Sequence, residues 1–370
     1  MTRFYLSPLI LALAMPFAVT ADPAFLQTEK HALKIETVVK GLSHPWGLAF
    51  LPDGRLLVTE RDGQLRYVSE GKLSEPIKGL PAIAVGGQGG LLDVLLDKDF
   101  ATNQKIYLSF AEPGADDTSS TAVIQATLAG DSLKEPVVVF SQQPKVKSKY
   151  HFGGRLVQEA DGHLFVTLGD RGSRREDVQP LNTHVGKVVR ITPTGEAASG
   201  NPFTEQADAK KDVWSFGHRN IQGATLDTAG RLWTHEHGPQ GGDEINIAKA
   251  GLNYGWPLIT YGEEYGGGVI GKTAAPGLEQ PLHYWVPSIA PSGMSFYQSP
   301  TFSGWQQNLL VGSLKFGQLV RLEIKDDKVS HEERIRIGSR IRDVKVHPDG
   351  SVYLLTDEGN GAILRMTPMK

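Results

Sequence analysis

The chain has 370 residues, with 38 basic and 41 acidic side chains and a formal net charge of −3. So small a net charge argues against nucleic acid or an anionic membrane surface as the main partner. The sequence contains no cysteine, which excludes disulfides, cysteine–zinc sites and thiol catalysis.

The first segment, residues 1–21, is predicted to be a secretory signal peptide. Arg3 precedes an apolar run over 6–19, and small residues follow as far as Ala21. The run is short for a membrane-spanning helix. We therefore expect cleavage after Ala21, export without membrane insertion, and a single mature domain over 22–370.

From residue 47 onward, one pattern of two apolar stretches separated by a polar turn and followed by a Gly-rich charged loop recurs along the chain. Its six copies occupy residues 47–63, 91–114, 154–172, 223–239, 293–317 and 342–361. Short strands that repeat every 40–50 residues or so are typical of a β-propeller. The sequence predicts an all-β fold, a six-bladed β-propeller of four-stranded antiparallel blades.

The first copy shows how one blade is built. GLAFL (47–51) and RLLVT (55–59) are predicted strands joined by the turn PDG (52–54). Two antiparallel strands joined by a tight turn place the start of the first beside the end of the second. Both ends of the pair should therefore lie on one face of the ring, around its central channel.

The residues at these strand ends are mostly cations, amides and histidines. They include Gln88, His151, Arg219, Asn220, Arg340 and Arg342 before the first strands, and Asp170, His237, Gly238, Pro239 and Lys315 after the second. We expect them to line a pocket at the top of the channel. Its cations indicate a ligand with several carboxylates or phosphates, because guanidinium groups pair with such groups bidentately.

Nothing in the chain predicts a nucleotide site. No GxxxxGK[ST] motif is present, and VGGQGGLLD (85–93) leads into a predicted strand rather than a helix. A nicotinamide enzyme would need a βαβ unit, which the all-β pattern lacks. A multi-anionic cofactor that is not a nucleotide remains.

His151, in KYHFGGRL (149–156), is the best candidate for a general base, since histidine side chains exchange protons near neutral pH. Asp170, in LGDRG (168–172) of the same predicted blade, should lie close enough to orient it. The oxygen-rich segment HEHGPQGGDE (235–244) suits Ca²⁺, with the carbonyls of Gly238 and Pro239 as ligands. Its two histidines alone are weak support for zinc.

Five groups of motifs occur in order along the chain: HFGGRL (151–156) with LGDRG (168–172), GHRNIQG (217–223), EHGPQGGDEIN (236–246), GSLKFGQLVRL (312–322) and SRIRDVKVHPDG (339–350). Together they resemble the soluble sugar dehydrogenases that depend on pyrroloquinoline quinone (PQQ), and among these the periplasmic aldose sugar dehydrogenases. The resemblance covers almost the whole predicted mature chain.

The resemblance implies a reaction and a set of roles. An aldose would be oxidised to its lactone, with His151 taking the anomeric hydroxyl proton, Asp170 orienting His151, and hydride passing to PQQ. A Ca²⁺ ion bound by the carbonyls of Gly238 and Pro239 would polarise the quinone, and electrons would go on to an unknown acceptor. The implied protein is periplasmic. The sequence predicts no obvious sticky edge, so we expect a monomer. The implied cofactor contacts are Gln88, Arg219, Asn220, Tyr261, Lys315, Arg340 and Arg342.

Two of these assignments have plain structural alternatives. A second Ca²⁺ would be held by Glu244 and the carbonyl of Tyr254, although Glu244 could instead cap a turn. Tyr261, in the loop LNYGWPLITYGEEYGGG (252–268), would cover one face of the PQQ ring, or it could pack at the edge of the propeller.

Two other classes of function stay open at this point. A Ca²⁺-dependent propeller lactonase or esterase would need several Asp, Glu and Asn side chains around one ion at the axis, whereas the axial positions here are chiefly cationic. A non-catalytic binding propeller would place arbitrary side chains at the channel, and its function would not depend on His151.

Overall fold

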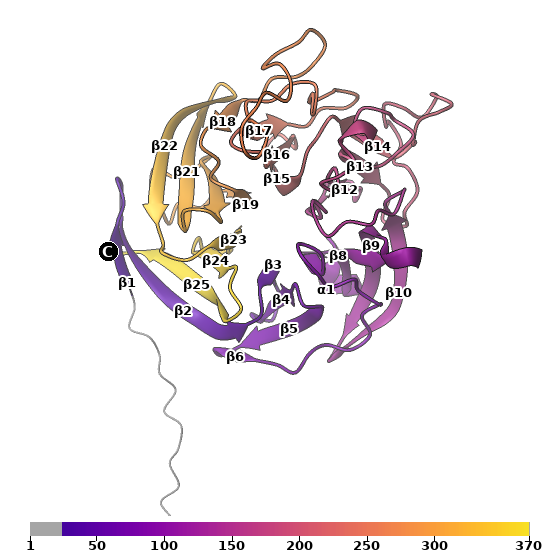
Figure 1. Ribbon diagram of the computed structural model, residues 1–370. Helices are drawn as coiled ribbons and strands as arrows, with labels where there is room; N and C mark the ends of the chain where they lie inside the picture. Colours follow the sequence, from indigo (N-terminus) through magenta and orange to yellow (C-terminus); the bar gives the residue numbers. More distant parts are fainter. Residues whose placement is uncertain (1–23, 370) are drawn as a thin grey trace, which may run out of the picture.

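The computed structural model describes residues 24–369, so the predicted signal peptide, residues 1–21, lies outside the described residues. Six antiparallel sheets form a closed ring around a central axis (Figure 1). The predicted six-bladed β-propeller is therefore confirmed. Five sheets have four strands, and the sixth has a fifth strand at its outer edge.

In each of the first three blades the first strand is nearest the axis (Figure 1). Blade 1 consists of β3 (Pro45–Phe50), β4 (Leu56–Glu60), β5 (Gln64–Ser69) and β6 (Lys72–Leu73). Blade 2 consists of β7 (Leu91–Leu96), β8 (Lys105–Pro113), β9 (Ser119–Ala129) and β10 (Ser132–Ser141). Blade 3 consists of β11 (Leu156–Gln158), β12 (Leu164–Thr167), β13 (Lys187–Ile191) and β14 (Val213–Phe216).

The other three blades follow the same plan. Blade 4 consists of β15 (Ile221–Leu226), β16 (Leu232–Glu236), β17 (Asp243–Ile247) and β18 (His283–Trp285). Blade 5 consists of β19 (Pro291–Phe296), β20 (Leu309–Ser313), β21 (Gln318–Lys325) and β22 (Lys328–Arg336). Blade 6 contains β23 (Ile341–Val346), β24 (Val352–Thr356) and β25 (Gly361–Pro368).

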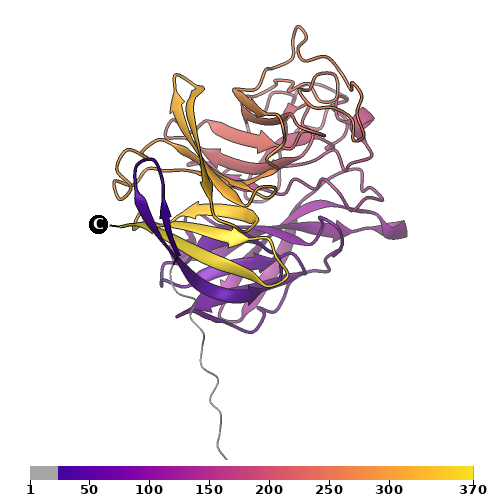
Figure 2. The same ribbon diagram turned by 60° about the vertical axis from the view of Figure 1, so that its left-hand side comes forward.

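The beginning of the described chain completes the last blade. β2 (Ala32–Leu42) pairs with β25 from Leu33 opposite Pro368 to Leu42 opposite Gly361. β1 (Ala24–Gln27) folds back on β2 as an outer fifth strand, and Figure 2 shows this hairpin against the last blade. The ring is thus closed by hydrogen bonds between the two ends of the folded chain.

Helix is almost absent from residues 24–369. It is limited to one turn of α-helix, α1 (Phe100–Asn103), and two 3₁₀ turns, η1 (Ala115–Asp117) and η2 (Arg175–Asp177). None of the described helices is long and apolar enough to cross a membrane.

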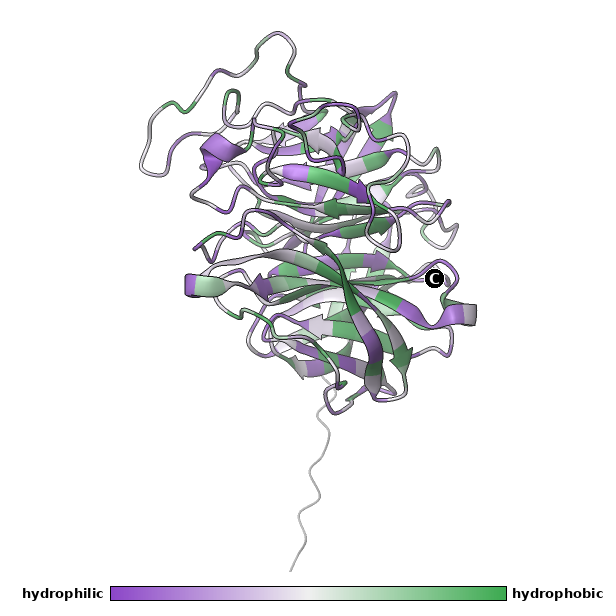
Figure 3. Ribbon diagram, turned by 90° about the vertical axis from the view of Figure 1, so that its right-hand side faces the viewer, coloured by the Kyte–Doolittle hydropathy of each residue, from purple (hydrophilic) through white to green (hydrophobic). Residues whose placement is uncertain are grey.

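Apolar side chains fill the spaces between neighbouring blades. Leu57 of β4 packs in one buried cluster with Leu91 of β7 and Leu108 of β8, which joins blades 1 and 2. Figure 3 shows the apolar colouring concentrated along the strands, while the loops are mostly polar. Burial of these faces stabilises the ring at roughly 25 cal/mol per Å² of apolar surface.

A buried ion cluster lies among the inner strands at the axis. The guanidinium Nη1 of Arg155 lies 3.1 Å from Asp93 Oδ1 and 3.1 Å from Asp343 Oδ1, and all three side chains are almost fully buried. Arg155 also packs its guanidinium over the Trp46 ring, 4.1 Å from the centroid. This cluster joins blades 1, 2, 3 and 6 at the centre.

The closure strand supplies a first prediction. Leu33 of β2 is fully buried and packs in the cluster that contains Phe302, Trp305 and Met366. Leu33→Ala should lower the free energy of unfolding by about 2–5 kcal/mol, as measured by urea denaturation. The control Lys34→Ala removes an exposed partner of Glu36 and should cost less than about 1 kcal/mol. Equal losses in the two variants would mean that the β2–β25 closure is not a stabilising contact.

Candidate active site

A pocket of about 410 Å³ opens at one end of the axis, and every blade contributes to it. We call it the central pocket. Five residues of the predicted cofactor set line it: Gln88, Asn220, Lys315, Arg340 and Arg342. Its walls also include Trp46, Arg61, Phe152, Gln222, His237 and Asp357.

The central pocket is strongly cationic. Four of its side chains are cations, and Asp357 is its one carboxylate. Asp357 Oδ2 lies 2.9 Å from Arg342 Nη2 and 3.5 Å from Arg340 Nη2, and its Oδ1 lies 3.6 Å from Arg61 Nη1. Burial would raise the pKa of Asp357, but the charge and hydrogen bond of Arg342 outweigh it and hold that pKa well below its usual range. An anion would offset the remaining positive charge.

His151 lies beside the pocket in an unusual backbone conformation. Its φ is 51°, in the left-handed region that non-glycine residues rarely adopt. Its backbone N–H donates to Gln88 Oε1 at 2.8 Å, and its ring Nδ1 lies 2.6 Å from Asp170 Oδ1. The next residue, Phe152, lines the pocket. The structure therefore brings Gln88, His151 and Asp170 together.

A glycine in LGDRG (168–172) allows the loop that carries Asp170 to contact His151. A Cβ on Gly169 would collide with the carbonyl oxygen of His151. Without a side chain there, the loop after β12 passes directly against the His151 backbone. The Asp170 N–H then donates to the carbonyl of Arg219 at 2.8 Å, which fixes the loop to blade 4.

Asp170 is 2% exposed and accepts several hydrogen bonds. Gly172 N–H donates to Oδ1 at 2.7 Å, and the indole N–H of Trp256 donates to Oδ2 at 2.9 Å. Burial would raise the pKa of Asp170, but the hydrogen bond and charge of His151 and the charge of Arg219 lower it overall. An ionised Asp170 accepts a hydrogen bond from Nδ1–H of His151. The ring proton therefore stays on Nδ1, and Nε2 points away from the carboxylate.

The sequence analysis missed Trp256. It lies in the loop between β17 and β18, 86 residues from Asp170, and the packing of this blade 4 loop against neighbouring blade 3 brings the two together. The sequence GWP (255–257), in the aromatic-rich loop 252–268, was the available signal of a site residue. Nothing in the local pattern indicates that this loop contacts blade 3.

Arg171, next to Asp170, clamps the segment that carries His151. Its guanidinium stacks 3.5 Å from the Phe152 ring centroid and donates to the carbonyls of Tyr150 and Ser148. Burial lowers the pKa of Arg171 to about 9. The side chain therefore acts as a buried support rather than as a ligand of the pocket.

A second, small cavity lies beneath the predicted calcium segment. It is lined by Gly238, Glu244 and Tyr254 of the predicted metal set, and also by Glu236 and Arg219. Glu244 is partly buried, and its pKa is raised, first by desolvation and then by the charge of Glu236. Its Oε2 accepts a hydrogen bond from Asn246 at 3.2 Å. Glu236 is buried and accepts a hydrogen bond from His218 Nδ1 at 2.9 Å, so a cation beside Glu244 would offset the repulsion that remains between the two carboxylates.

Gly238 and Pro239 lie in the irregular segment that follows β16. The N–H of Gly238 donates to Asp243 Oδ1 at 3.0 Å, and a Cβ on Gly238 would collide with the carbonyl oxygens of Gly241 and Gly242. Nε2–H of the adjacent His237 donates to the Pro291 carbonyl, 2.6 Å away, and burial lowers the pKa of His237 to about 3.

Two residues of the predicted cofactor set lie outside the walls of the central pocket. Arg219 packs its guanidinium 5.4 Å from the Trp256 ring centroid and donates to the His237 carbonyl at 3.1 Å. Tyr261 stacks on Tyr284 with ring centroids 3.8 Å apart and lines a neighbouring groove.

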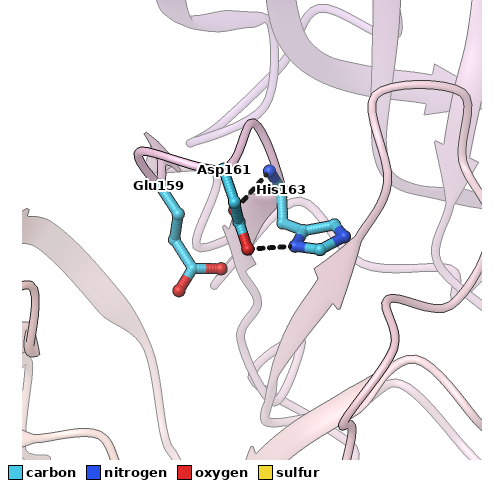
Figure 4. A group of neighbouring side chains, drawn as sticks. All are labelled: Glu159, Asp161 and His163. Atoms are coloured by element: carbon cyan, nitrogen blue, oxygen red, sulfur yellow. Dashed lines mark hydrogen bonds and ion pairs between the residues drawn. The ribbon is translucent and has the colours of Figure 1, made fainter.

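One other group of possible metal ligands occurs among residues 24–369. Glu159, Asp161 and His163, in and around the β11–β12 turn, bring their ligand atoms within 4.8 Å of one another (Figure 4). Arg190 already pairs with this group, since its Nε contacts Glu159 Oε2 and its Nη2 lies 3.0 Å from His163 Nδ1. A cation there would have to displace the arginine, so the group is a structural ion cluster.

Known proteins resemble this chain over almost its whole length. The family described as Glucose / Sorbosone dehydrogenase matches residues 42–365. Aldose sugar dehydrogenase YliI of Escherichia coli is 44% identical over 99% of this chain and 98% of its own length. The crystal structure of the soluble aldose sugar dehydrogenase of Escherichia coli superposes with a TM-score of 0.88 at 44% identity, covering 91% of this chain and 100% of that one.

A third relative was solved with the cofactor. The PQQ-bound aldose sugar dehydrogenase of Streptomyces coelicolor superposes with a TM-score of 0.76 at 28% identity, covering 92% of this chain and 99% of that one. The chain is a six-bladed propeller enzyme of the quinoprotein sugar dehydrogenase class. It belongs to the Glucose / Sorbosone dehydrogenase family, which confirms the predicted resemblance.

Trp256 supplies a prediction about the site. Trp256→Phe keeps the ring but loses the donor to the buried Asp170, so stability should fall by about 1–3 kcal/mol and the NMR resonances of the His151 ring should shift. The control Trp214→Phe loses a similar bond, from Nε1 to the Ala248 carbonyl at 2.9 Å, away from the pocket. His151 resonances that respond equally to both variants would show that Trp256 does not position the pair.

Proposed function

We propose that this protein oxidises aldose sugars at the anomeric carbon to the lactone, with PQQ as cofactor and Ca²⁺ as its metal. The observation that carries the proposal is the contact between His151 Nδ1 and Asp170 Oδ1, 2.6 Å long, at the edge of a cationic pocket. Relatives named for aldose sugar oxidation and for bound PQQ support the assignment.

The residues of the central pocket fit PQQ, which carries three carboxylates. Lys315, Arg340 and Arg342 would hold carboxylate and quinone oxygens, with Gln88 and Asn220 as amide contacts. The Nε of Arg342 is buried without a hydrogen-bond partner, so the pocket has a donor to spare. When bound, PQQ supplies a two-electron acceptor for the hydride that leaves the anomeric carbon.

His151 acts as the general base in this proposal. Because Asp170 engages Nδ1, Nε2 is the nitrogen that accepts the proton of the anomeric hydroxyl. The proton leaves the hydroxyl oxygen and the hydride leaves the anomeric carbon. Together these losses convert the C–O bond into the C=O of a lactone. Asp170 stabilises the imidazolium that forms, and it is itself held by Trp256 and Gly172.

The calcium assignments concern two places, the Gly238–Pro239 segment and the small cavity beneath it. Gly238 and Pro239 would offer backbone oxygens to one Ca²⁺, which when bound supplies a Lewis acid beside the cofactor. Glu244 and the carbonyl of Tyr254 would hold a second ion, and the like charges of the neighbouring Glu236 and Glu244 support a cation there. Arg219 lines the small cavity and donates to the His237 carbonyl. It would contact the cofactor from the boundary between the two cavities.

Further parts of the proposal concern the cell. We propose that residues 1–21 direct export to the periplasm, where the mature chain works as a monomer and passes electrons to a separate acceptor. Tyr261 lies in the groove beside the central pocket, and its proposed contact with one face of the cofactor would require the cofactor to extend toward that groove.

Base and cofactor contacts can be separated by mutation. His151→Ala should lower kcat by about 10²–10⁴-fold while PQQ still binds. Arg342→Ala or Lys315→Ala should raise the Kd for PQQ by about 10–100-fold, because a charged partner of a carboxylate is lost. Arg334→Ala, on outer strand β22, is the control cation. Turnover of the His151→Ala enzyme at the wild-type rate would disprove the base assignment.

Glu244 supplies a prediction about metal and pH. Its pKa is raised in the folded state, so the folded calcium-free protein binds an extra proton, and its stability falls as the pH rises above the ordinary range of glutamate. Glu244→Gln should remove that fall and also most of the rise in Tm caused by Ca²⁺. Thermal melts at about pH 5 and about pH 8, with EDTA or Ca²⁺, measure both effects.

The exposed Glu75→Gln variant is the control for Glu244. It should keep the pH dependence and the calcium response of the wild type. If Ca²⁺ stabilised Glu244→Gln as strongly as the wild type, the second calcium site would have to lie elsewhere.

A further inference from the structure

A lysine that the proposed reaction does not use is completely buried in blade 3. Lys187 is the first residue of β13, and its side chain is 0% exposed. Burying an ammonium group is costly unless it is hydrogen-bonded and paired with an opposite charge. Asp177, the carboxylate whose charge acts on Lys187, is already paired with Arg174. The ammonium therefore depends on other partners.

Those partners are backbone carbonyls. Lys187 Nζ donates to the carbonyls of Val178 and Val185, both at 2.7 Å, and at 3.4 Å to the carbonyl of Asp177. An ammonium has three N–H donors, so each of them has an acceptor. Since the three carbonyls come from the two ends of the segment 177–185, the ammonium closes that segment into a loop.

The carbonyls of Asp177 and Val178 need such a donor. They stand at the C-terminal end of the 3₁₀ turn η2, where backbone carbonyls lack partners within the helix. Lysine side chains commonly donate to carbonyls at such ends. The loop is also tightly closed, because a Cβ on Gly186 would lie only 2.8 Å from the Val178 side chain. The segment has little room to shift while the ammonium is in place.

The segment that Lys187 closes packs against Trp256. Val178, Val185 and Trp256 form one buried apolar cluster. The side-chain amide of Gln179, in the same segment, donates to the Trp256 carbonyl at 2.7 Å. The ring and the backbone of Trp256 are thus both held by residues of this segment.

Trp256 in turn holds the His151–Asp170 pair. Its indole N–H donates to Asp170 Oδ2 at 2.9 Å, and Asp170 Oδ1 lies 2.6 Å from His151 Nδ1. Lys187 also borders the pair through its backbone, since its carbonyl accepts the N–H of Leu168 at 2.9 Å, two residues before Asp170. The contacts of Lys187 therefore reach Asp170 from two sides.

We propose that Lys187 is a positioning residue for the sugar oxidation: its ammonium closes the segment 177–185 and so holds Trp256 against Asp170. The effect on turnover rests on the proposed function, whereas the effect on the His151–Asp170 pair does not. Without the ammonium the three carbonyls lose a shared donor, the segment moves, and His151 loses its alignment. The contacts to cofactor and sugar stay in place.

Lys187→Met keeps the length of the side chain and removes its donors. The NMR resonances of the Trp256 indole N–H and of the His151 ring should shift in the cofactor-free protein. In the enzyme reconstituted with PQQ and Ca²⁺, kcat should fall roughly ten- to a hundredfold, with little change in KM. All measurements are made at about pH 6, because burial lowers the pKa of Lys187 to about 7 and the charged form is the one tested.

Lys211→Met is the matched control. Lys211 Nζ also donates to a backbone carbonyl, that of Gln206 at 2.7 Å, but it does so on the exposed edge of blade 3. This variant should leave both NMR signals and kcat as in the wild type.

A double variant tests the path from Lys187 to the pair. If Lys187 acts through Trp256, the losses of kcat in Lys187→Met and Trp256→Phe should not multiply, and the double variant should resemble the weaker single variant. Val178→Ala keeps the ammonium but thins the contact with Trp256. It should shift the indole resonance and lower kcat less than Lys187→Met does.

The absence of cysteine from the chain allows a chemical rescue. Lys187→Cys carries a unique thiol, which 2-bromoethylamine converts, in the denatured chain, into a side chain of nearly the length of lysine that ends in an ammonium. Alkylation with 2-bromoethanol gives a neutral side chain of the same length. After refolding, the ammonium form should regain the wild-type indole resonance and kcat, and the neutral form should not. Wild-type protein taken through the same cycle is the reference.

Each outcome decides one proposal. Unshifted Trp256 and His151 resonances in Lys187→Met, losses that multiply in the double variant, or equal rescue by the neutral side chain would overturn the role of Lys187. If Lys187→Met does not fold, an unshifted indole resonance in Val178→Ala overturns it instead. A wild-type enzyme that oxidises no aldose would overturn the proposed function alone, since the resonances still show whether Lys187 positions the pair.

Discussion

Closure of the ring is the constraint on which the rest of the structure depends. The pocket walls come from all six blades, and they meet only because β2 pairs with β25 and joins the two ends of the described chain. No blade holds more than a fraction of the site. At the axis, Arg155 between Asp93 and Asp343 supplies a buried charged floor. Removing one partner from such a cluster leaves an uncompensated buried charge, which is far more costly than losing a surface ion pair.

Backbone shape, more than side-chain choice, sets the geometry of the His151–Asp170 pair. His151 has a positive φ, and Gly169 lets the loop after β12 pass against it. Arg171 then fixes the same segment from below through the carbonyls of Tyr150 and Ser148. The pair is therefore held by glycine-permitted close approach and buried hydrogen bonds, and it is in place in the protein alone. Such preorganisation reduces what substrate binding must accomplish.

The fold and the centre of the site were predictable because the repeat carries them. An apolar pattern with a period of two and a turn between strands fixes which ends face the axis, so Gln88, Lys315 and Arg342 could be placed in one pocket without coordinates. Trp256 and Tyr261 lie outside the repeat, in the long β17–β18 loop, and no periodicity predicts the path of such a loop. Glu236 was not predicted as a site residue either. A carboxylate at the end of a buried strand indicates a cation site only when a second carboxylate, here Glu244, lies beside it.

The division between blades and loops also separates the His151–Asp170 pair from the groove that Tyr261 and Tyr265 line. Cofactor-type cations and the His151–Asp170 pair sit at strand ends, where any shift would disturb the packing between blades. The groove lined by Tyr261 and Tyr265 is built instead from the β17–β18 loop, and Arg175 and Gln240 anchor that loop. Loops of this kind tolerate changes in length and sequence that strands do not. Residues of that loop such as Tyr265 can therefore change while the His151–Asp170 pair stays fixed, because the two are supported by different parts of the fold.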